Sequence, residues 1–181
     1  MNRSDKKTGS HEILINKAGH SRYDKADSIE NLIRYISREN GKSKSDLICC
    51  GAFGATDFTD IDTTIKQFEC VQLLHTRKGN FGRHIDHEIY SFSTDEEKKI
   101  AQNNISVEKL AEEMALDFYK DGFQVYYGVH KKDCTANNLH IHFAVNTVNF
   151  ITGNKRREYK SATRSREQRL RRIVNDTLRK Y

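Results

Sequence analysis

The sequence has no long apolar segment. No run approaches the roughly 20 residues that a membrane helix needs, so we expect no membrane insertion. Residues 1–10 are polar, which excludes a secretory signal there and predicts a flexible leader. The cysteines form no CxxC pair, so their spacing does not predict a zinc site, and without an export signal we expect reduced thiols. The four are Cys49, Cys50, Cys70 and Cys134.

Length and composition favour one globular domain over 1–181. A chain of 181 residues is long enough to bury a core. Hydrophobic residues make up 36% and charged residues 31%, and this balance is typical of a folded domain and not of a disordered chain.

The positive charge is concentrated at the C-terminal end. The 28 residues from Asn154 to Tyr181 hold 11 Lys and Arg against 3 Asp and Glu, whereas the other 153 hold 20 against 22. The net charge of +6 therefore comes from this last segment, in which we expect a basic helix over 163–181. Such a segment is typical of a surface that binds nucleic acid, although a solvated basic helix has the same composition.

Hydrophobic periodicity predicts helices and strands in mixed order. Helical spacing predicts helices over Asp27–Glu39 and Asp62–Arg77, from Thr94 to a break near Asn103, and from Ser106 to Gly122. Three capping pairs are expected, Asp27 with Glu30, Thr94 with Glu97, and Ser165 with Gln168 at the start of the basic helix. Strands are expected over His11–Asn16, His84–Ser93, Phe123–His130 and Leu139–Asn149, and Leu47–Phe53 fits a strand or an extended loop. We therefore expect an α+β fold with a central, mostly antiparallel sheet of about five strands flanked by helices.

Histidines recur on the last two expected strands. Strand side chains alternate between faces, so His140 and His142 share a face, with Cα atoms about 7 Å apart. His130 faces the same way if the two strands pair. Three neutral imidazoles with open positions make a divalent-metal site able to bind a phosphate oxygen. The alternative interpretation is a polar, solvated strand face.

A third strand carries two further polar residues in phase. His87 and Ser91 share one face, where either could orient a metal ligand or a phosphate. Ile85 and Ile89 lie on the same face, so an ordinary core histidine is also consistent with the pattern.

One tyrosine has a chemically suggestive setting. On a helix, Tyr35 lies roughly 110° from the centre of the apolar stripe, which places it at the flank and not in the core. Arg34, Arg38 and Lys42 surround it with positive charge. Nearby cations or a metal favour the phenolate, a nucleophile for a phosphodiester, while the alternative is an ordinary tyrosine at the border of the core.

Together these residues resemble the relaxases of conjugative and mobilisable elements, specifically the MobP-like group of the HUH endonuclease superfamily. Three motifs occur in the family's order and span most of the chain. They are the tyrosine helix at Leu32–Lys42, the HxxxSF strand at His87–Phe92, and His130 followed by the NLHIHxxxN strand at Asn138–Asn146.

The resemblance implies roles for these residues. Tyr35 would be the nucleophile that forms a 5′-phosphotyrosine link at an origin of transfer, and Ser91 would contact DNA near the cut. The metal, Mg²⁺ or Mn²⁺, would be held by His130, His140 and His142. Residues expected to bind DNA or to support the ligands are Ser91, His87, Asn138, Asn146, Arg34, Arg38, Lys42, Arg164, Arg171 and Arg172.

The resemblance also implies partners and a setting. We expect single-stranded origin DNA, accessory relaxosome proteins and a coupling protein as partners, in the bacterial cytoplasm, with the chain as the N-terminal part of a longer protein. Two positions depart from the family pattern. The loop from His130 to Asn138 is longer, so Asp133 could replace or assist His130, and Asn137 stands where the family often has an acid.

Two other functions fit parts of the sequence. Replication initiators and transposases of the same superfamily often carry the tyrosine after the histidine motif, and Tyr159 or Tyr181 would then be the nucleophile. A non-catalytic nucleic-acid-binding module would leave the histidine face solvated. Metal-dependent nicking distinguishes this module from both kinds of enzyme.

Overall fold

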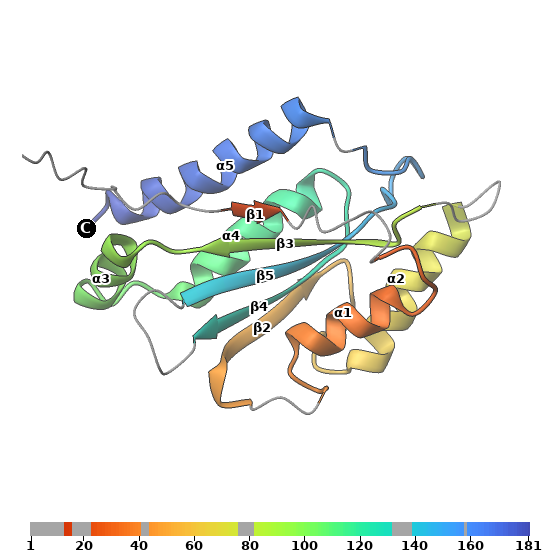
Figure 1. Ribbon diagram of the computed structural model, residues 1–181, viewed down its shortest axis with the longest axis horizontal. Helices are drawn as coiled ribbons and strands as arrows, with labels where there is room; N and C mark the ends of the chain where they lie inside the picture. Colours follow the sequence, from red (N-terminus) through yellow and green to blue (C-terminus); the bar gives the residue numbers. More distant parts are fainter. Residues whose placement is uncertain (1–12, 16–22, 41–43, 76–81, 132–138, 158) are drawn as a thin grey trace, which may run out of the picture.

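One five-stranded antiparallel sheet forms the centre of the molecule (Figure 1). The computed structural model describes residues 13–15, 23–40, 44–75, 82–131, 139–157 and 159–181. The strands run in the order β1-β3-β5-β4-β2, and every neighbouring pair is antiparallel. Their bounds are β1 (Ile13–Ile15), β2 (Leu47–Phe53), β3 (Ile85–Ser91), β4 (Val125–Lys131) and β5 (Leu139–Asn146). The expected α+β fold is confirmed, and Leu47–Phe53 is a strand.

Helices flank this sheet on both faces. They are α1 (Ser28–Ile36), α2 (Ile61–His75), α3 (Thr94–Gln102), α4 (Val107–Lys120) and α5 (Lys160–Leu178), with a short 3-10 turn, η1 (Lys44–Asp46). Figure 1 shows α1 and α2 on one side and α5 on the other. Within the described ranges, no helix combines the length and the apolar composition needed to cross a membrane.

The basic helix begins earlier than the expected 163. α5 starts at Lys160, and Tyr159 takes the extended N-cap conformation. Nothing in the first turn opposes a helix, since it has no glycine or proline and includes Ala162, the best helix former. The sequence-based boundary at 163 was therefore three residues too late, and the expected capping pair of Ser165 and Gln168 was wrong, because both residues lie inside the helix.

Each face of the sheet has its own apolar core. On the α4 face, Ile141, Phe143 and Val145 of β5 are fully buried with Phe118 of α4. The alternation expected along β5 is therefore present, and it leaves His140 and His142 on the opposite face. Full burial of a large apolar side chain contributes about 1.5–3 kcal/mol, so this alternation strongly fixes the register of the strand.

The helix that carries Tyr35 packs directly on the histidine face. Its apolar stripe, Ile29, Leu32, Ile33 and Ile36, is at most 4% exposed. Gly128 of β4 permits the close approach, because a Cβ there would come within 2.6 Å of Ile36 Cγ2. Because Gly128 has no side chain, the end of α1 packs directly against the middle of the sheet.

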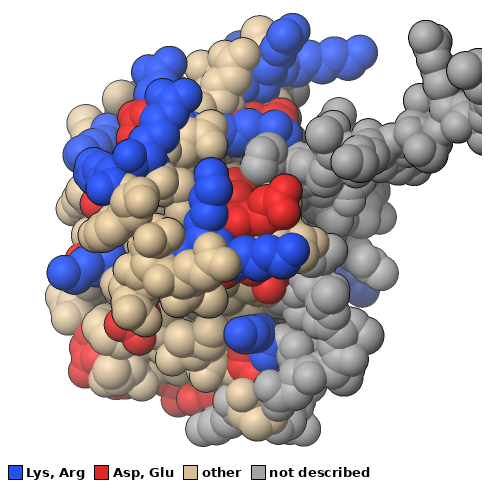
Figure 2. Space-filling model, turned by 90° about the vertical axis from the view of Figure 1, so that its left-hand side faces the viewer, with Lys and Arg blue, Asp and Glu red and all other residues tan. Residues whose placement is uncertain are grey.

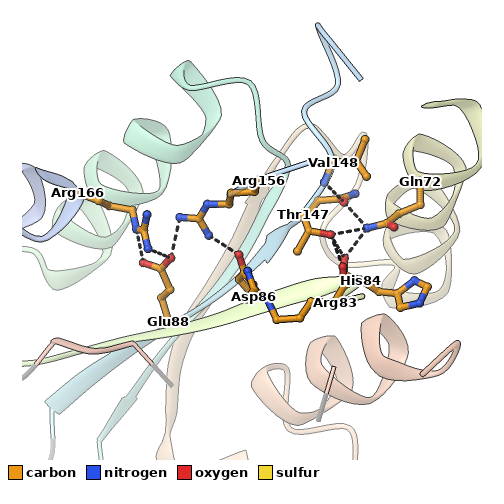
Figure 3. Close-up of polar contacts among 10 residues, drawn as sticks. Gln72, Arg83, His84, Asp86, Glu88, Thr147, Val148, Arg156 and Arg166 are labelled. Carbon is orange, nitrogen blue, oxygen red and sulfur yellow. Dashed lines mark hydrogen bonds and ion pairs between the residues drawn. The ribbon is translucent and has the colours of Figure 1, made fainter. Parts of the chain in front are cut away.

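Paired charges hold α5 to the other face. Glu88 of β3 is 1% exposed and accepts hydrogen bonds from Arg156 and Arg166, while Asp86 accepts from Arg156 and Arg83 (Figure 3). A buried carboxylate is tolerated when its charge and lone pairs are matched in this way. Part of the basic C-terminal segment therefore stabilises the fold.

Candidate active site

Three histidines meet near the ends of β4 and β5. His130 and His140 are register partners, and His142 follows on the same face. The ligating nitrogens of the three lie within 4.8 Å of one another, and the ring centroids are 4.6–5.6 Å apart. His130 is fully buried and His142 is 3% exposed. This burial argues against the solvated strand face that the sequence left open.

The chemistry of these nitrogens fits a metal ion. Burial lowers the pKa of His130 to about 4, and burial together with the neighbouring histidines lowers the pKa of His142. Both rings are therefore neutral at pH 7, which is the form that binds metal. His142 Nε2 is buried and has no hydrogen-bond partner in the described structure, and an unpartnered buried nitrogen is what an ion would use.

His130 is fixed by groups at the end of α1. Its Nε2 donates to the carbonyl of Ile36 at 2.8 Å, and its Nδ1 accepts from Arg38 Nη2 at 2.8 Å. A carbonyl can only accept, so it places the proton on Nε2 and leaves the Nδ1 lone pair facing Arg38. In this tautomer Nδ1 is the nitrogen of His130 that could serve as a ligand, once Arg38 moves aside.

Arg38 is buried within the site and does not lie on its surface. Its backbone φ is 63°, a left-handed conformation uncommon for arginine, and its side chain is 3% exposed. The guanidinium donates twice to Asp46 at 2.9 Å and also to the carbonyl of Tyr35. Burial raises the pKa of Asp46, but the hydrogen bonds and charge of Arg38 outweigh burial, so the pKa is lowered. The ion pair is therefore charged at pH 7.

Tyr35 lies against the histidine cluster. It is half-buried, at the flank that the periodicity predicted. Its ring makes edge contacts with His142 at 5.5 Å and His87 at 6.1 Å between centroids, and the Arg38 guanidinium lies 5.1 Å from it. The candidate nucleophile and the candidate metal ligands therefore share one site.

The tyrosines proposed for the alternative enzyme lie elsewhere. Tyr159 and Tyr181 sit at the two ends of α5 and are 56% and 70% exposed. Within the described part of the chain, neither makes a ring contact with a histidine of the cluster. The geometry favours Tyr35 over both.

His87 links the cluster to a residue that sequence reasoning missed. Its Nε2 lies 2.8 Å from His142 Nδ1, and its Nδ1 lies 3.0 Å from the hydroxyl of Tyr23. Burial, followed by the charges of His130 and His140, lowers the pKa of His87 to about 4. Tyr23 precedes α1 in a segment without regular structure, so no periodicity could have indicated it.

Comparison with known proteins assigns the chain to a family. Residues 20–181 match the family described as Relaxase: MobA/VirD2-like, nuclease domain. The chain belongs to this relaxase family. No curated protein and no solved structure matches it. The relaxase domain is thus a DNA-nicking nuclease of the mobilisation type, and its three clustered histidines could hold a metal ion.

Other expected site residues of the relaxase domain differ in their surroundings. Ser91 is half-buried and is the register partner of His140, so it lies beside the cluster. Arg34 binds Glu30, Glu39 and Asp62. These three acids occupy its guanidinium and raise its pKa. Lys42 and Asn138, with Asp133 and Asn137 of the loop, lie outside the described residues.

Asn146 is a buried structural residue of the relaxase domain. It is fully buried at the end of β5, and its amide bonds Gln72, Gln124 and the carbonyl of Phe68. Gln72 also bonds Thr147 and the carbonyl of His84, as Figure 3 shows. These contacts tie α2 to the sheet, and the Asn146 amide has no exposed surface to offer DNA.

The arginines of α5 divide into two kinds. Arg164 and Arg172 are exposed and form no ion pair with a described residue. Arg171 pairs with Glu167 at 2.6 Å, and Arg169 binds Asp117 of α4 and Asp121, the C-cap residue of that helix. Figure 2 shows Lys and Arg gathered along the upper part of the molecule, where α5 lies. The exposed subset is the part that remains available for a polyanion.

Proposed function

We propose that this relaxase domain cuts one DNA strand at an origin of transfer through Tyr35 and stays joined to the 5′ phosphate. The observation that supports the proposal is the packing of the Tyr35 ring on His142 and His87. A nucleophile must lie beside the groups that stabilise the developing charge, and no other described tyrosine has this relation to the ligand cluster.

The metal-binding residues in this proposal are His130, His140 and His142, with Mg²⁺ or Mn²⁺ as the ion. A bound ion would supply positive charge beside the scissile phosphate. The protein provides neutral imidazoles, because burial keeps His130 and His142 unprotonated. It also fixes the tautomer of the His130 ring through the carbonyl of Ile36, which leaves the lone pair on Nδ1.

The chemical step is a transesterification. The Tyr35 oxygen forms a bond to phosphorus, and the bond from phosphorus to the 3′ oxygen breaks. The phenol gives up its proton, and the 3′ oxygen takes one up to become a free hydroxyl. The phosphodiester is exchanged for a phosphotyrosine, so the 3′ hydroxyl of a transferred strand reverses the step without ATP. The Arg38 guanidinium lies 5.1 Å from the centre of the Tyr35 ring, so a positive charge stands beside the proposed nucleophile.

DNA contacts are proposed for two surfaces. Ser91, together with Lys42 and Asn138, would contact the single strand near the cut. Arg164 and Arg172 on α5 would bind phosphates of the flanking DNA, since both are exposed. Accessory relaxosome proteins and a coupling protein would deliver the origin and pass the joined strand onward.

The experiment that tests the proposal compares wild type with Tyr35→Phe on a single-stranded origin oligonucleotide with Mn²⁺. Denaturing gels report the covalent protein–DNA adduct. We expect the adduct with wild type, Tyr159→Phe and Tyr181→Phe, and none with Tyr35→Phe. An adduct that persists in Tyr35→Phe and is lost in Tyr159→Phe or Tyr181→Phe would instead support the initiator mechanism.

A further inference from the structure

We propose that Tyr23 is a positioning residue of the metal centre: through His87 it sets which nitrogen of His142 carries the proton. The inference rests on the proposed function only in that the ion is taken to bind His142. It concerns a residue outside the three motifs and a chain of contacts that ends at the histidine cluster.

Three side chains form this chain in sequence. The Tyr23 hydroxyl lies 3.0 Å from His87 Nδ1, and His87 Nε2 lies 2.8 Å from His142 Nδ1. The last nitrogen, His142 Nε2, is buried without a described partner. His87 and His142 are 8% and 3% exposed, so water has little access to the two imidazoles in the middle.

Protons can be arranged along this chain in two ways. In the first, His142 donates to His87, His87 donates to the Tyr23 oxygen, and His142 Nε2 keeps its lone pair. In the second, Tyr23 donates to His87, His87 donates to His142, and His142 Nε2 carries a buried proton. Each imidazole has one donor and one acceptor when neutral, so the two arrangements are linked from end to end. Only the first lets His142 bind an ion.

The two cluster histidines differ in how this choice is made. His130 donates to a carbonyl, which can only accept, so its tautomer is fixed locally. His142 faces an imidazole, which can accept or donate, so its tautomer depends on the next residue along. Metal-binding histidines usually donate to a carboxylate, a carbonyl or water. Here the Tyr23 oxygen supplies the acceptor at the far end of the row, and with it every N–H of the two imidazoles can be paired.

Tyr23 is held where it can do this. Its own carbonyl accepts from the backbone N–H of His84 at 2.7 Å, which pins it beside the start of β3. Its ring meets the His87 ring edge-on, with centroids 6.1 Å apart, and packs partly on the α1 core. The residue is half-exposed, so its hydroxyl proton can reach solvent when the oxygen accepts from His87.

Removal of the Tyr23 hydroxyl should therefore disfavour the first arrangement. In wild type only the second arrangement leaves a buried N–H unpaired, at His142 Nε2. Without the Tyr23 hydroxyl the first also leaves one unpaired, at His87 Nδ1, so the first arrangement loses its advantage. We expect Tyr23→Phe to weaken metal binding by about tenfold, at the lower end of what loss of a supporting hydrogen bond costs at metal sites.

The test measures Mn²⁺ binding to the full chain by titration calorimetry. Tyr23→Phe and His87→Ala should bind more weakly than wild type, and Tyr159→Phe, which removes a distant hydroxyl, should bind equally well. His87→Gln should recover part of the loss, since its amide can accept from His142 and donate to Tyr23. Equal Mn²⁺ affinity in Tyr23→Phe and wild type would overturn the inference.

A second readout does not depend on a bound ion. Nitrogen-15 NMR of the histidine side chains, recorded with a chelator, reports the tautomer of His142. We expect a proton on Nδ1 in wild type and a shift toward Nε2 in Tyr23→Phe. A purely structural role would lower the melting temperature without changing the tautomer, and that result would also overturn the inference. If wild type binds Mn²⁺ and Tyr23→Phe shows the expected loss, but wild type forms no Tyr35 adduct, the proposed nicking is refuted and the positioning role of Tyr23 stands.

Discussion

The two faces of the sheet bury polar groups in opposite ways. On the α5 face, Glu88 is matched by two arginines and Asp86 by two, so each buried charge has a partner. On the α1 face, neutral histidines are linked in a row that ends at an unpartnered nitrogen, His142 Nε2. Matched burial stabilises a fold, whereas an unmatched buried atom indicates a ligand. The comparison separates the face that stabilises this relaxase domain from the face proposed for its chemistry.

The largest effect on stability is expected on the α5 face. Glu88→Ala would leave Arg156 and Arg166 buried beside an empty acceptor site, and breaking a buried pair in this way costs about 3–5 kcal/mol. Urea unfolding should show that loss, while the Mn²⁺ affinity of the folded protein should stay unchanged. A large loss of affinity in Glu88→Ala would mean that the two faces are coupled.

The opposite result is expected for the histidine face. His142→Ala should reduce Mn²⁺-dependent nicking by about 100-fold or more, the loss of several kcal/mol of charge stabilisation. Its stability without metal should fall far less than that of Glu88→Ala, because only one side of the ring has a hydrogen-bond partner. Nicking rates on denaturing gels and unfolding in chelator check both parts. If His142→Ala nicked DNA as fast as wild type, His142 would not be a metal ligand.

The same face should make stability sensitive to acid. The pKa of His87 and of His130 is lowered to about 4 in the fold, against 6.5 for an unperturbed histidine. Between these values the unfolded chain binds protons that the native chain does not, so stability is retained above pH 6.5 and lost as the pH falls toward 4. The expected slope is up to about 1.4 kcal/mol per pH unit for each proton.

Urea unfolding in chelator, measured from pH 7 to pH 4, tests this slope. His130→Asn removes one titrating group and should make the dependence shallower, whereas Glu88→Ala should keep the histidine contribution. A pH profile that is the same for His130→Asn and wild type would show that His130 is not held neutral by burial.

The smallest effect is expected within α5 itself. Arg164→Ala and Arg172→Ala should each weaken DNA binding and lower the salt slope by about 1 for each lost phosphate contact, without a change in stability. Arg169→Ala, which removes the partner of Asp117, should lower stability and leave the salt slope intact. Fluorescence anisotropy at several salt concentrations measures both slopes. Equal salt slopes for Arg164→Ala and Arg169→Ala would contradict the division of the helix into bound and free arginines.

Strand alternation made much of the site predictable. The period of two along β5 places His140 and His142 opposite the apolar set, and the pairing with β4 adds His130. The helical period likewise places Tyr35 at the border of the α1 core. These features depend on which side chains are buried, and the periodicity of apolar residues in the local sequence indicates which they are.

What could not be predicted depends on contacts distant in the sequence. Arg38 was expected to face DNA or to support the ligands, and it does bond His130, but its direction depends on Asp46 and on a left-handed backbone. In the sequence, Asp86 and Glu88 are simply two negative charges. Their partners, Arg156 and Arg166, can be recognised only in the folded protein, where β3 and α5 lie side by side. No local pattern specifies such partners, and the same holds for Tyr23.

The exact residue at which a helix begins was also only partly predictable from the sequence. A capping box does form at α3, but between Ser93 and Glu96, one residue before the expected pair of Thr94 and Glu97. Both pairs satisfy the spacing rule, so the sequence cannot choose between them. At α1 the expected cap at Asp27 makes no side-chain hydrogen bond at all.

The most direct test of the account is to locate the DNA on the protein. Wild-type relaxase is reacted with the origin oligonucleotide and Mn²⁺, the covalent adduct is digested with nuclease and protease, and the peptides are read by mass spectrometry. The account predicts a nucleotide on the peptide that carries Tyr35. A nucleotide on Tyr159, on Tyr181 or on Tyr23 would contradict it.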